Sequence, residues 1–473
     1  MSGFDAAVRL VYVASAACFV IGLHLMNAPP TANRGSRISA AGMVAAVAAT
    51  VALVAHDSSI TATGWAVLLV GALLGSGAGL GFARSVRMTA IPQLVSLFNA
   101  MGGGAAALVA IAGFVASSPA SSLGGRIAVS TAIDVAIGAL TFSGSLVACG
   151  KLQGTIPGRP ILVPGGRATN AILALAAIAG AVLLAARPHS TAMLSLALAA
   201  SLAFGVAMVL RIGGADMPVV ISLLNALTGT AVAVAGFVID NSVLIIAGAL
   251  VGASGGILTK LMADAMNRSI VAIMSGGFGG GDSGGGDVVG ATGPVRQVSA
   301  DDAAIQLAYA SKVVIVPGYG LAAAQAQHAV RDLAQLLEGR GIEVSYAIHP
   351  VAGRMPGHMN VLLAEADVPY TQLKPMDEIN PEFPRTDVAL VIGANDVVNP
   401  AARRGGNAVS GMPILDVDQA KSVIVIKRSM GHGYAGIDNE LYTDPKTSMF
   451  FADAKAGLVA LTAAVKTLVG GSG

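Results

Sequence analysis

The chain has 473 residues, of which 54% are hydrophobic and only 11% are Asp, Glu, Lys or Arg, and its formal net charge is +2. A chain so close to neutral, without a basic tract or interleaved aromatic residues, carries no signature of nucleic-acid binding. Its two cysteines, Cys18 and Cys149, both fall in apolar runs, so the sequence predicts neither a disulfide framework nor a metal site.

The charged residues divide the chain into two parts. Residues 1–270 contain 13 Lys and Arg, 6 Asp and no Glu, whereas residues 271–473 contain 15 Lys and Arg and 20 Asp and Glu. Because a soluble domain is about 25% charged, the first part is typical of a chain solvated by lipid. We therefore predict a transmembrane domain over 1–270, a flexible Gly-rich linker over 271–297 and a soluble domain over 298–473.

Several apolar runs are long enough to cross a membrane, which takes about 20 mostly apolar residues. In chain order these runs are 4–26, 37–56, 60–82, 91–117, 126–149, 170–187, 190–210, 216–239 and 243–266. The first part of the chain is therefore predicted to be an α-helical polytopic membrane bundle of about nine transmembrane helices.

The loops between these runs differ in charge. Alternate loops carry ten Lys and Arg, whereas the intervening loops carry only Arg126 and Arg187. Lys and Arg are retained on the cytoplasmic side of a membrane. We therefore expect the N-terminus outside and the C-terminal domain in the cytoplasm.

Polar residues inside spanning helices are costly and are functional candidates by default. The candidates are Asn99, Asp134, Ser145, Asp216, Asn225 and Thr228. Hydrogen bonds between helices would explain Asn99 and Asn225 equally well. Asp134 lies about two turns after Arg126, so an ion pair between the two is as plausible as a functional role.

Glycines recur at positions typical of close helix packing. Gly71, Gly75 and Gly79 share one helix face, and further glycines cluster at 102–104 and around Gly255. We expect neighbouring backbones to approach these faces closely, or the helices to unwind locally.

Beyond the linker, strands and helices alternate. The expected strands are Lys312–Val316, Ile342–Ile348, Val388–Ile392 and Val423–Ile426, with helices running up to Gly339 and over Ala454–Leu468. This alternation predicts an α/β doubly wound Rossmann-like domain with a parallel sheet.

The first of these strands is followed by a dinucleotide-binding fingerprint. Gly318, Gly320 and Ala323 match G-x-G-x-x-G/A. In that motif the first glycine permits a tight turn, the second lets the backbone approach a pyrophosphate, and the small third residue lets helix and strand pack. The motif alone is weak, but its place between a strand and a helix favours a nucleotide site.

Two features favour NADP over NAD. The second strand ends in His349 and Pro350, where NAD-binding domains carry an acid for the ribose. Lys427 and Arg428, beside Ser429, follow a later strand and could bind a 2′-phosphate. A solvated strand end would explain the same two cations equally well.

Several long segments together resemble one family, the β subunit of the proton-translocating NAD(P) transhydrogenase. They are Gly213–Gly229, Lys260–Ile270, Val316–Gln327, Ile348–Tyr370, Ile392–Ala402 and Ile426–Gly436. The resemblance implies that NADP(H) binds here, that a partner α subunit binds NAD(H), and that hydride passes directly between the nicotinamides. It also implies proton entry that drives NADPH formation, a dimer of protomers, and a multi-pass location in a bacterial-type inner membrane, surrounded by lipid.

The resemblance also implies roles for residues that match the family's motifs. In the membrane, Asn99, Ser145, Asp216 and Asn225 match positions for proton transfer or coupling, and Asp396 would lie near the nicotinamide. The cofactor-binding positions would be Gly318, Tyr319, Gly320, Ala323, Val351, Ala352, Gly353, Arg354, Gly393, Ala394, Asn395, Asp396, Lys427, Arg428, Ser429, Tyr434 and Ala435.

One residue departs from the family's pattern. Some members have His where this chain has Asn99, and Asn cannot exchange a proton in the physiological range. Either a group supplied by the partner subunit takes the proton, or Asn99 orients water.

Other classes of protein share part of this pattern. Composition and fingerprint alone also permit an ion transporter or channel with a nucleotide-sensing cytoplasmic domain, or a membrane-anchored NADP-binding scaffold without turnover. The cations at 427–428 and the long soluble segments favour the transhydrogenase.

Overall fold

The computed structural model divides into two compact units: Met1–Pro157, Ile161–Arg211 and Ile221–Thr259 form the first, and Gly158–Pro160, Ile212–Val220 and Lys260–Gly473 the second. The residues that it describes are 3–26, 29–56, 60–86, 90–116, 125–158, 160–161, 166–187, 189–213, 216–266, 269–276, 293–353, 357–405, 409–433 and 435–470. Most of the linker predicted over 271–297 therefore lies outside the described residues, as do Arg354 and Tyr434.

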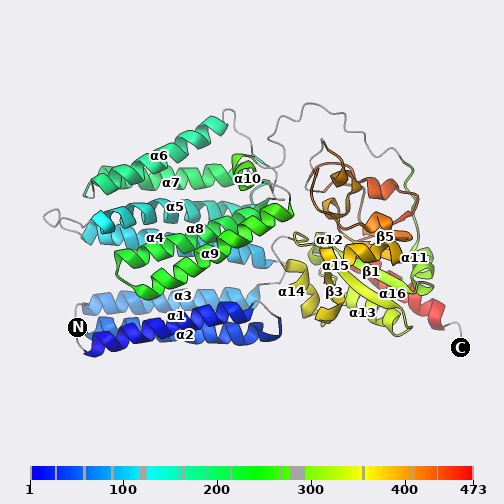
Figure 1. Cartoon of the computed structure of the whole chain (residues 1–473), viewed down its shortest axis with the longest axis horizontal. Helices are drawn as coiled ribbons and strands as arrows, with labels where there is room; N and C mark the ends of the chain where they lie inside the picture. The colour runs from blue at the N-terminus through cyan, green and yellow to red at the C-terminus, as the bar shows by residue number, and fades with distance from the viewer. Residues whose placement is uncertain are drawn as a thin grey trace. The chain divides into compact units, whose positions relative to one another are not determined.

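Long apolar helices make up the membrane part of the chain (Figure 1). They are α1 (Gly3–Met26), α2 (Pro29–His56), α3 (Ala62–Ser85), α4 (Ile91–Ala116), α5 (Gly125–Gln153), α6 (Gly166–Ala186), α7 (Thr191–Leu210), α8 (Met217–Val238) and α9 (Ser242–Ala265). Nine helices of the described chain are long and apolar enough to cross a membrane. This number agrees with the predicted bundle of about nine transmembrane helices and fits a multi-pass membrane protein.

Several helices extend beyond the apolar runs that predicted them, and α2 and α5 are examples. α2 begins at Pro29 rather than near residue 37, and α5 continues to Gln153. Hydropathy marks only the segment that lipid surrounds, whereas the helical backbone satisfies its own hydrogen bonds on both sides of that boundary.

Glycines bring some helices into backbone contact and leave others apart. A Cβ built on Gly138 of α5 would lie 2.9 Å from the backbone nitrogen of Ala107 in α4, and one on Gly255 of α9 would lie 2.9 Å from that of Ala226 in α8. At Gly71, Gly75 and Gly79 of α3, no described atom comes within 4 Å of such a Cβ. The packing prediction is therefore wrong for α3 within the described chain.

A six-stranded parallel sheet forms the centre of the second unit. Its strands are β1 (Lys312–Pro317), β2 (Glu343–Ile348), β3 (Leu373–Pro375), β4 (Val388–Ile392), β5 (Ser422–Lys427) and β6 (Thr447–Phe451). Their order is β3-β2-β1-β4-β5-β6, with Val313 beside Val344 on one side and Val388 on the other. This order reverses at β1 and β4, as it does in dinucleotide-binding sheets.

The sequence predicted four of these strands and missed two. β3 has three residues, and β6 (TSMFF) lacks the Val and Ile that marked the others. The helix expected up to Gly339 is interrupted, giving α12 (Tyr319–Ala323) and α13 (Gln327–Glu338). Gln325 between them has a φ of 50°, which a helix does not allow.

Further helices complete the unit. Besides α12 and α13, the α-helices are α10 (Ile270–Gly276), α11 (Ala300–Ala308), α14 (His358–Glu365), α15 (Met376–Ile379) and α16 (Ala454–Gly470). The 3-10 helices are η2 (Tyr370–Gln372), η3 (Asn380–Arg385), η4 (Asp396–Val398), η5 (Pro400–Arg403), η6 (Val417–Gln419) and η7 (Glu440–Thr443). α16 packs against α11 and α13.

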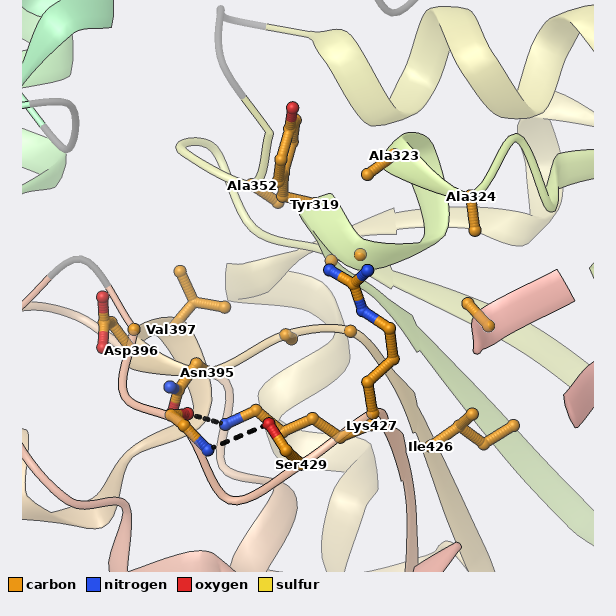
Figure 2. Close-up of a pocket in the computed structure, with 18 of the residues that line it drawn as sticks. Tyr319, Ala323, Ala324, Ala352, Asn395, Asp396, Val397, Ile426, Lys427 and Ser429 are labelled. Carbon is orange, nitrogen blue, oxygen red and sulfur yellow. Dashed lines mark hydrogen bonds between the residues drawn. The ribbon is translucent and has the colours of Figure 1, made fainter. Parts of the chain in front are cut away.

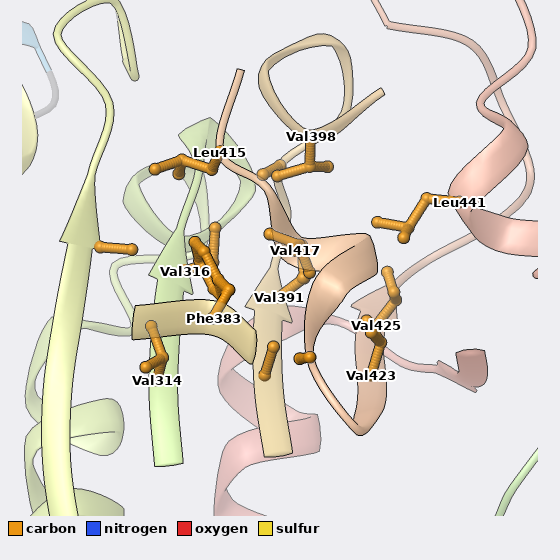
Figure 3. Packing of buried hydrophobic residues seen from close by; sticks show 14 of the residues in the cluster. Val314, Val316, Phe383, Val391, Val398, Leu415, Val417, Val423, Val425 and Leu441 are labelled. Atoms are coloured by element: carbon orange, nitrogen blue, oxygen red, sulfur yellow. The ribbon is translucent and has the colours of Figure 1, made fainter. Parts of the chain in front are cut away.

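An apolar cluster of this unit lies against one face of the sheet (Figure 3). Side chains such as Val314, Val391 and Val423 pack there against Phe383 and Leu441 from the 3-10 segments. All of these are fully buried. The cluster holds the loops that follow β4 and β5 against the sheet, and those loops carry the candidate site.

Replacing Phe383 with Ala should destabilise the sheet by about 3–5 kcal/mol, because the ring is fully buried and its removal leaves a cavity. Hydrogen–deuterium exchange of β1 and β4 in the full chain measures the change. Tyr309→Ala is the matched control, since that ring is 86% exposed. Equal exchange in both variants would contradict the packing described here.

Candidate functional site

A cavity of about 530 Å³ lies at the carboxyl edge of the sheet. Its walls come from the loops after β1, β2, β4, β5 and β6, so it spans the point where the strand order reverses. Figure 2 shows Lys427 and Ser429 on the side of Asn395, with Tyr319 and Ala323 across from them. In open parallel sheets this crevice is where ligands bind.

The fingerprint turn after β1 is hydrogen-bonded to the end of β4 and the loop that follows it. Gly318 N donates to Ile392 O and Gly320 N to Gly393 O, both at 2.9 Å. A Cβ on Gly320 would lie 2.6 Å from the Cα of Gly393, which itself has a φ of 62°. The motif's second glycine is predicted to let the backbone approach a ligand, and in this structure Gly320 also lets two segments of the chain's own backbone approach each other.

The cations at the end of β5 stand in different environments. The Lys427 ammonium donates to the carbonyl oxygen of Gly431 and lies 4.7 Å from the centroid of the Tyr442 ring. Burial lowers the pKa of Lys427, and the charge of Asp396 opposes that shift. Arg428 is exposed, and no described residue offers its guanidinium a hydrogen bond or ion pair. Lys427 is therefore held in place, whereas Arg428 keeps its donors for a ligand.

A network of polar residues fixes the loop after β4. Tyr442 donates its hydroxyl to Ala394 O, and Asn439 Nδ2 donates to Asn395 O, each at 3.0 Å. Both Tyr442 and Asn439 are buried, and burial raises the pKa of Tyr442, which therefore remains a donor. The Tyr442 ring also contacts the ammonium group of Lys427, so this one side chain positions two walls of the cavity.

Asp396 joins this loop to the Gly-rich segment after β5. Its Oδ2 accepts a hydrogen bond from Ala435 N at 3.1 Å. A Cβ on Gly433 would lie 2.7 Å from the carboxylate carbon of Asp396, so glycine is needed for this approach. The carboxylate thus holds Gly433 and Ala435 close to the loop after β4, at the edge of the cavity.

His349, at the end of β2, is buried and neutral. Its Nε2 donates to Pro413 O at 2.8 Å, and its Nδ1 accepts from Val351 N at 3.2 Å. Burial lowers the pKa of His349 to about 4. Because Val351 lines the cavity, this histidine supports one wall rather than contacting a ligand.

In the membrane part, two of the predicted polar residues form a hydrogen bond with each other. Asn99 Nδ2 of α4 donates to Ser145 Oγ of α5 at 2.9 Å, and both residues are buried. Asn225 lies on α8 one turn before Thr228, whose methyl carbon would lie 3.3 Å from a Cβ on Gly102 of α4. Asp216, fully buried, directly precedes α8, where its backbone oxygen accepts from Val220 N.

Most of the predicted cofactor residues meet around the cavity. Its walls include Gly318, Tyr319, Gly320, Ala323, Val351, Ala352, Gly353, Gly393, Ala394, Asn395, Asp396, Lys427, Arg428 and Ser429. Ala435 contacts the site through Asp396. Arg354 and Tyr434 lie outside the described residues, so their predicted roles remain predictions.

Sequence reasoning missed the residues that support the site. Asn439 and Tyr442 fall between β5 and β6, and no strand was expected at β6. The cavity also includes Asp453 and Ala454, at the start of α16. A strand prediction that weighed Thr, Met and Phe as well as Val and Ile could have found β6 and drawn attention to the loop before it.

Comparison with known proteins covers most of the chain, including the membrane helices and the sheet domain. A family model described as NAD(P) transhydrogenase beta subunit matches residues 8–464. Two proteins called NAD(P) transhydrogenase subunit beta, both from Rhodospirillum rubrum, are each 47% identical to the chain over 453 residues. The aligned residues cover 94% of this chain and 96% of each relative.

The buried His349 should make the sheet less stable in acid. Its pKa is about 4 when folded against 6.5 for an unperturbed histidine, so the contribution of the neutral imidazole to the stability of the sheet is complete above pH 6.5 and is lost as the pH falls towards 4. Hydrogen exchange of residues 344–353 in the full chain should rise over that range. His349→Gln should reduce this pH dependence, whereas the exposed His328→Gln should not; an identical pH profile in all three chains would refute the assignment.

Proposed function

Because this chain belongs to the family of NAD(P) transhydrogenase β subunits, we propose that the cavity at the carboxyl edge of its sheet binds NADP(H). The role of the family is hydride transfer between NAD(H) and NADP(H) coupled to proton translocation across a membrane. In this proposal the partner α subunit binds NAD(H), and the two nicotinamides meet for direct hydride transfer.

The observation that carries the proposal is the unequal pair of cations beside the cavity. Lys427 is held by Gly431 and Tyr442, while Arg428 has no partner among the described residues. A guanidinium with unused donors binds a phosphate through two parallel hydrogen bonds. No acid follows β2, so the ribose contact typical of NAD sites is missing from its usual place. Both features favour the 2′-phosphorylated coenzyme.

The rest of the cavity fits such a ligand. Its volume of about 530 Å³ falls within the usual range of roughly 300–1,000 Å³ for cofactor sites. Glycine and alanine form much of the wall, so backbone groups can approach a ligand closely. Asp396 is the one acid that the loop after β4 contributes to the lining of the cavity, and its charge suits the cationic ring of the oxidised nicotinamide better than a phosphate.

Each part of the site has a role in this proposal. The bound coenzyme supplies or accepts the hydride. Lys427, Arg428 and Ser429 hold its 2′-phosphate, the turn at Gly318 and Gly320 supports its middle, and Asp396 orients the segment that covers it. That segment excludes water from the nicotinamide ring during hydride transfer. The protein residues thus position and shield the coenzyme and do not themselves react.

The membrane helices would carry the protons. The buried bond between Asn99 and Ser145 supports a polar path along α4 and α5, with Asn225 and Asp216 on or beside α8 as further members. Asn99 Oδ1 has no partner among the described residues, so it can accept a hydrogen bond from water or from a donor of the partner subunit. Asn99 would therefore orient the path rather than carry the proton.

The remaining features of the proposal concern domains and assembly. Residues 1–270 would be the proton-translocating domain, 271–297 a flexible linker, and 298–473 a doubly wound Rossmann-like NADP(H) domain. The asymmetry of loop charges supports an N-terminus outside and a cytoplasmic C-terminal domain in a bacterial-type inner membrane. The working assembly would be a dimer of protomers, each with an α subunit, in which proton entry drives NADPH formation.

Replacing Arg428 with Ala should weaken NADPH binding about tenfold to a hundredfold, because hydrogen bonds to a charged group contribute about 1.5–3 kcal/mol. NADPH fluorescence in a titration of the full chain in lipid nanodiscs measures the affinity. Binding of NADH, which lacks the 2′-phosphate, should be unchanged.

The matched control is Arg340→Ala, which removes an exposed arginine outside the cavity. It should leave the affinity for NADPH unaltered. If Arg428→Ala weakens NADPH and NADH by the same factor, or neither, the 2′-phosphate is not bound by this residue.

A further inference from the structure

One buried acid in the membrane helices has no role in the site described above. Asp134 lies in the interior of α5, nine residues after the helix begins, and its exposed fraction is 0%. Neither of its carboxylate oxygens has a hydrogen-bond partner among the described residues. The other acids within the bounds of the long helices, Asp5 and Asp264, lie within two residues of a helix end.

Arg126, the ion-pair partner that the sequence spacing suggested, does not neutralise Asp134. Arg126 is exposed at the start of α5 and forms no ion pair with Asp134. The helices packed around α5 offer no alternative, because α4, α7 and α8 contain no Asp, Glu, Lys, Arg or His within their bounds. α6 has one charged residue, Arg167, in its first turn. The other titratable groups of α5 itself, Cys149 and Lys151, lie near its far end.

The register between α4 and α5 shows what Asp134 faces. Asn99 meets Ser145, Gly103 lies against Thr141, and Ala107 lies against Gly138. Continuing this antiparallel register by one turn places Ala110, also fully buried, opposite Asp134. The neighbouring position is thus a methyl group, which leaves the carboxyl group without a polar contact from α4.

Asp134, Thr141 and Ser145 form a stripe along one face of α5, which we call the α5 polar stripe. Spacings of seven and four residues keep the three side chains on that face, and all three are fully buried. The stripe extends about 16 Å, which is eleven residues at a helical rise of 1.5 Å. It begins near the ends of α4 and α5 that are joined by residues 117–124 and reaches the Asn99–Ser145 pair.

We propose that Asp134 is the proton-binding group of the membrane domain, and that it exchanges protons with water molecules that the Asn99–Ser145 pair orients along the α5 polar stripe. This inference rests on the proposed function and supplies the titratable group that Asn99 cannot be. An ionised carboxylate without a counter-charge is strongly disfavoured in a membrane interior, whereas the neutral acid is tolerated. Asp134 therefore takes up a proton that arrives from one side and releases it only when water on the polar stripe can accept it.

In the proposed orientation, Asp134 lies towards the outer side and Asn99–Ser145 towards the cytoplasm. Thr141 stands between them, with a hydroxyl that donates to Gly138 O at 3.1 Å and can accept in turn. Water molecules must bridge the remaining gaps, since the stripe is longer than hydrogen bonds between its three side chains can span. The step moves one proton and changes no covalent bond other than the O–H bonds that carry it.

The test compares Asp134→Asn, which keeps size but cannot titrate, with Asp134→Glu, which restores the acid. With the α subunit in sealed vesicles, Asp134→Asn should lower proton-coupled hydride transfer by about a hundredfold, while NADPH binding to the chain stays unchanged. Asp134→Glu should recover most of the rate. The control Asp240→Asn, at a side chain that is 80% exposed, should behave as wild type.

A second measurement detects the proton on Asp134 directly. A hydrophobic carbodiimide reacts with a neutral carboxylic acid in lipid to give a stable N-acylurea, which peptide mass spectrometry locates. Wild-type chain should be labelled at Asp134, and labelling should fall as the pH is raised. Wild-type coupling in Asp134→Asn, or no labelling of Asp134 at any pH, would overturn the inference. Absence of coupled transfer in the wild-type complex would instead overturn the proposed function, and the inference with it.

Discussion

The loops after β1 and β4 approach each other more closely than side chains would permit. Gly318 and Gly320 donate to Ile392 and Gly393, and any Cβ at Gly320 would collide with the backbone of Gly393. This contact forms the floor of the cavity at the reversal of strand order. Because the two backbones meet there, Lys427 and Arg428 at the end of β5 and the small residues after β2 line the same cavity.

The polar network around this contact makes the site a single unit. Tyr442 donates to the loop after β4 and lies beneath the ammonium of Lys427, and Asp396 binds the segment after β5. Movement of Tyr442, Lys427 or Asp396 would shift the other two, since they are linked through hydrogen bonds and the cation–π contact around the same loops. A ligand that contacts both the cations and Asp396 would therefore tighten the whole edge of the sheet.

The membrane bundle is stabilised in a different way, because apolar side chains gain no hydrophobic free energy when they move from lipid into the bundle. Its contacts depend on glycine and on a few buried polar groups, as at Gly138 against Ala107 and Asn99 with Ser145. α3 shows the converse, because its glycine face meets nothing within the described chain. The polar groups on α5 thus stand out as positions where function, rather than lipid solvation, accounts for the residue.

The sequence alone determined the number of spanning helices, four of the six strands, the fingerprint turn and the pair of cations. These depend on local composition and on hydrophobic period, which act within one element. It could not determine that Gly320 rests on Gly393, that Tyr442 supports Lys427, or that Asp134 has no hydrogen-bond partner in the part of the chain that the structure describes. Those facts depend on contacts between segments distant in the chain, and only tertiary packing decides which of many equally polar or small residues meet.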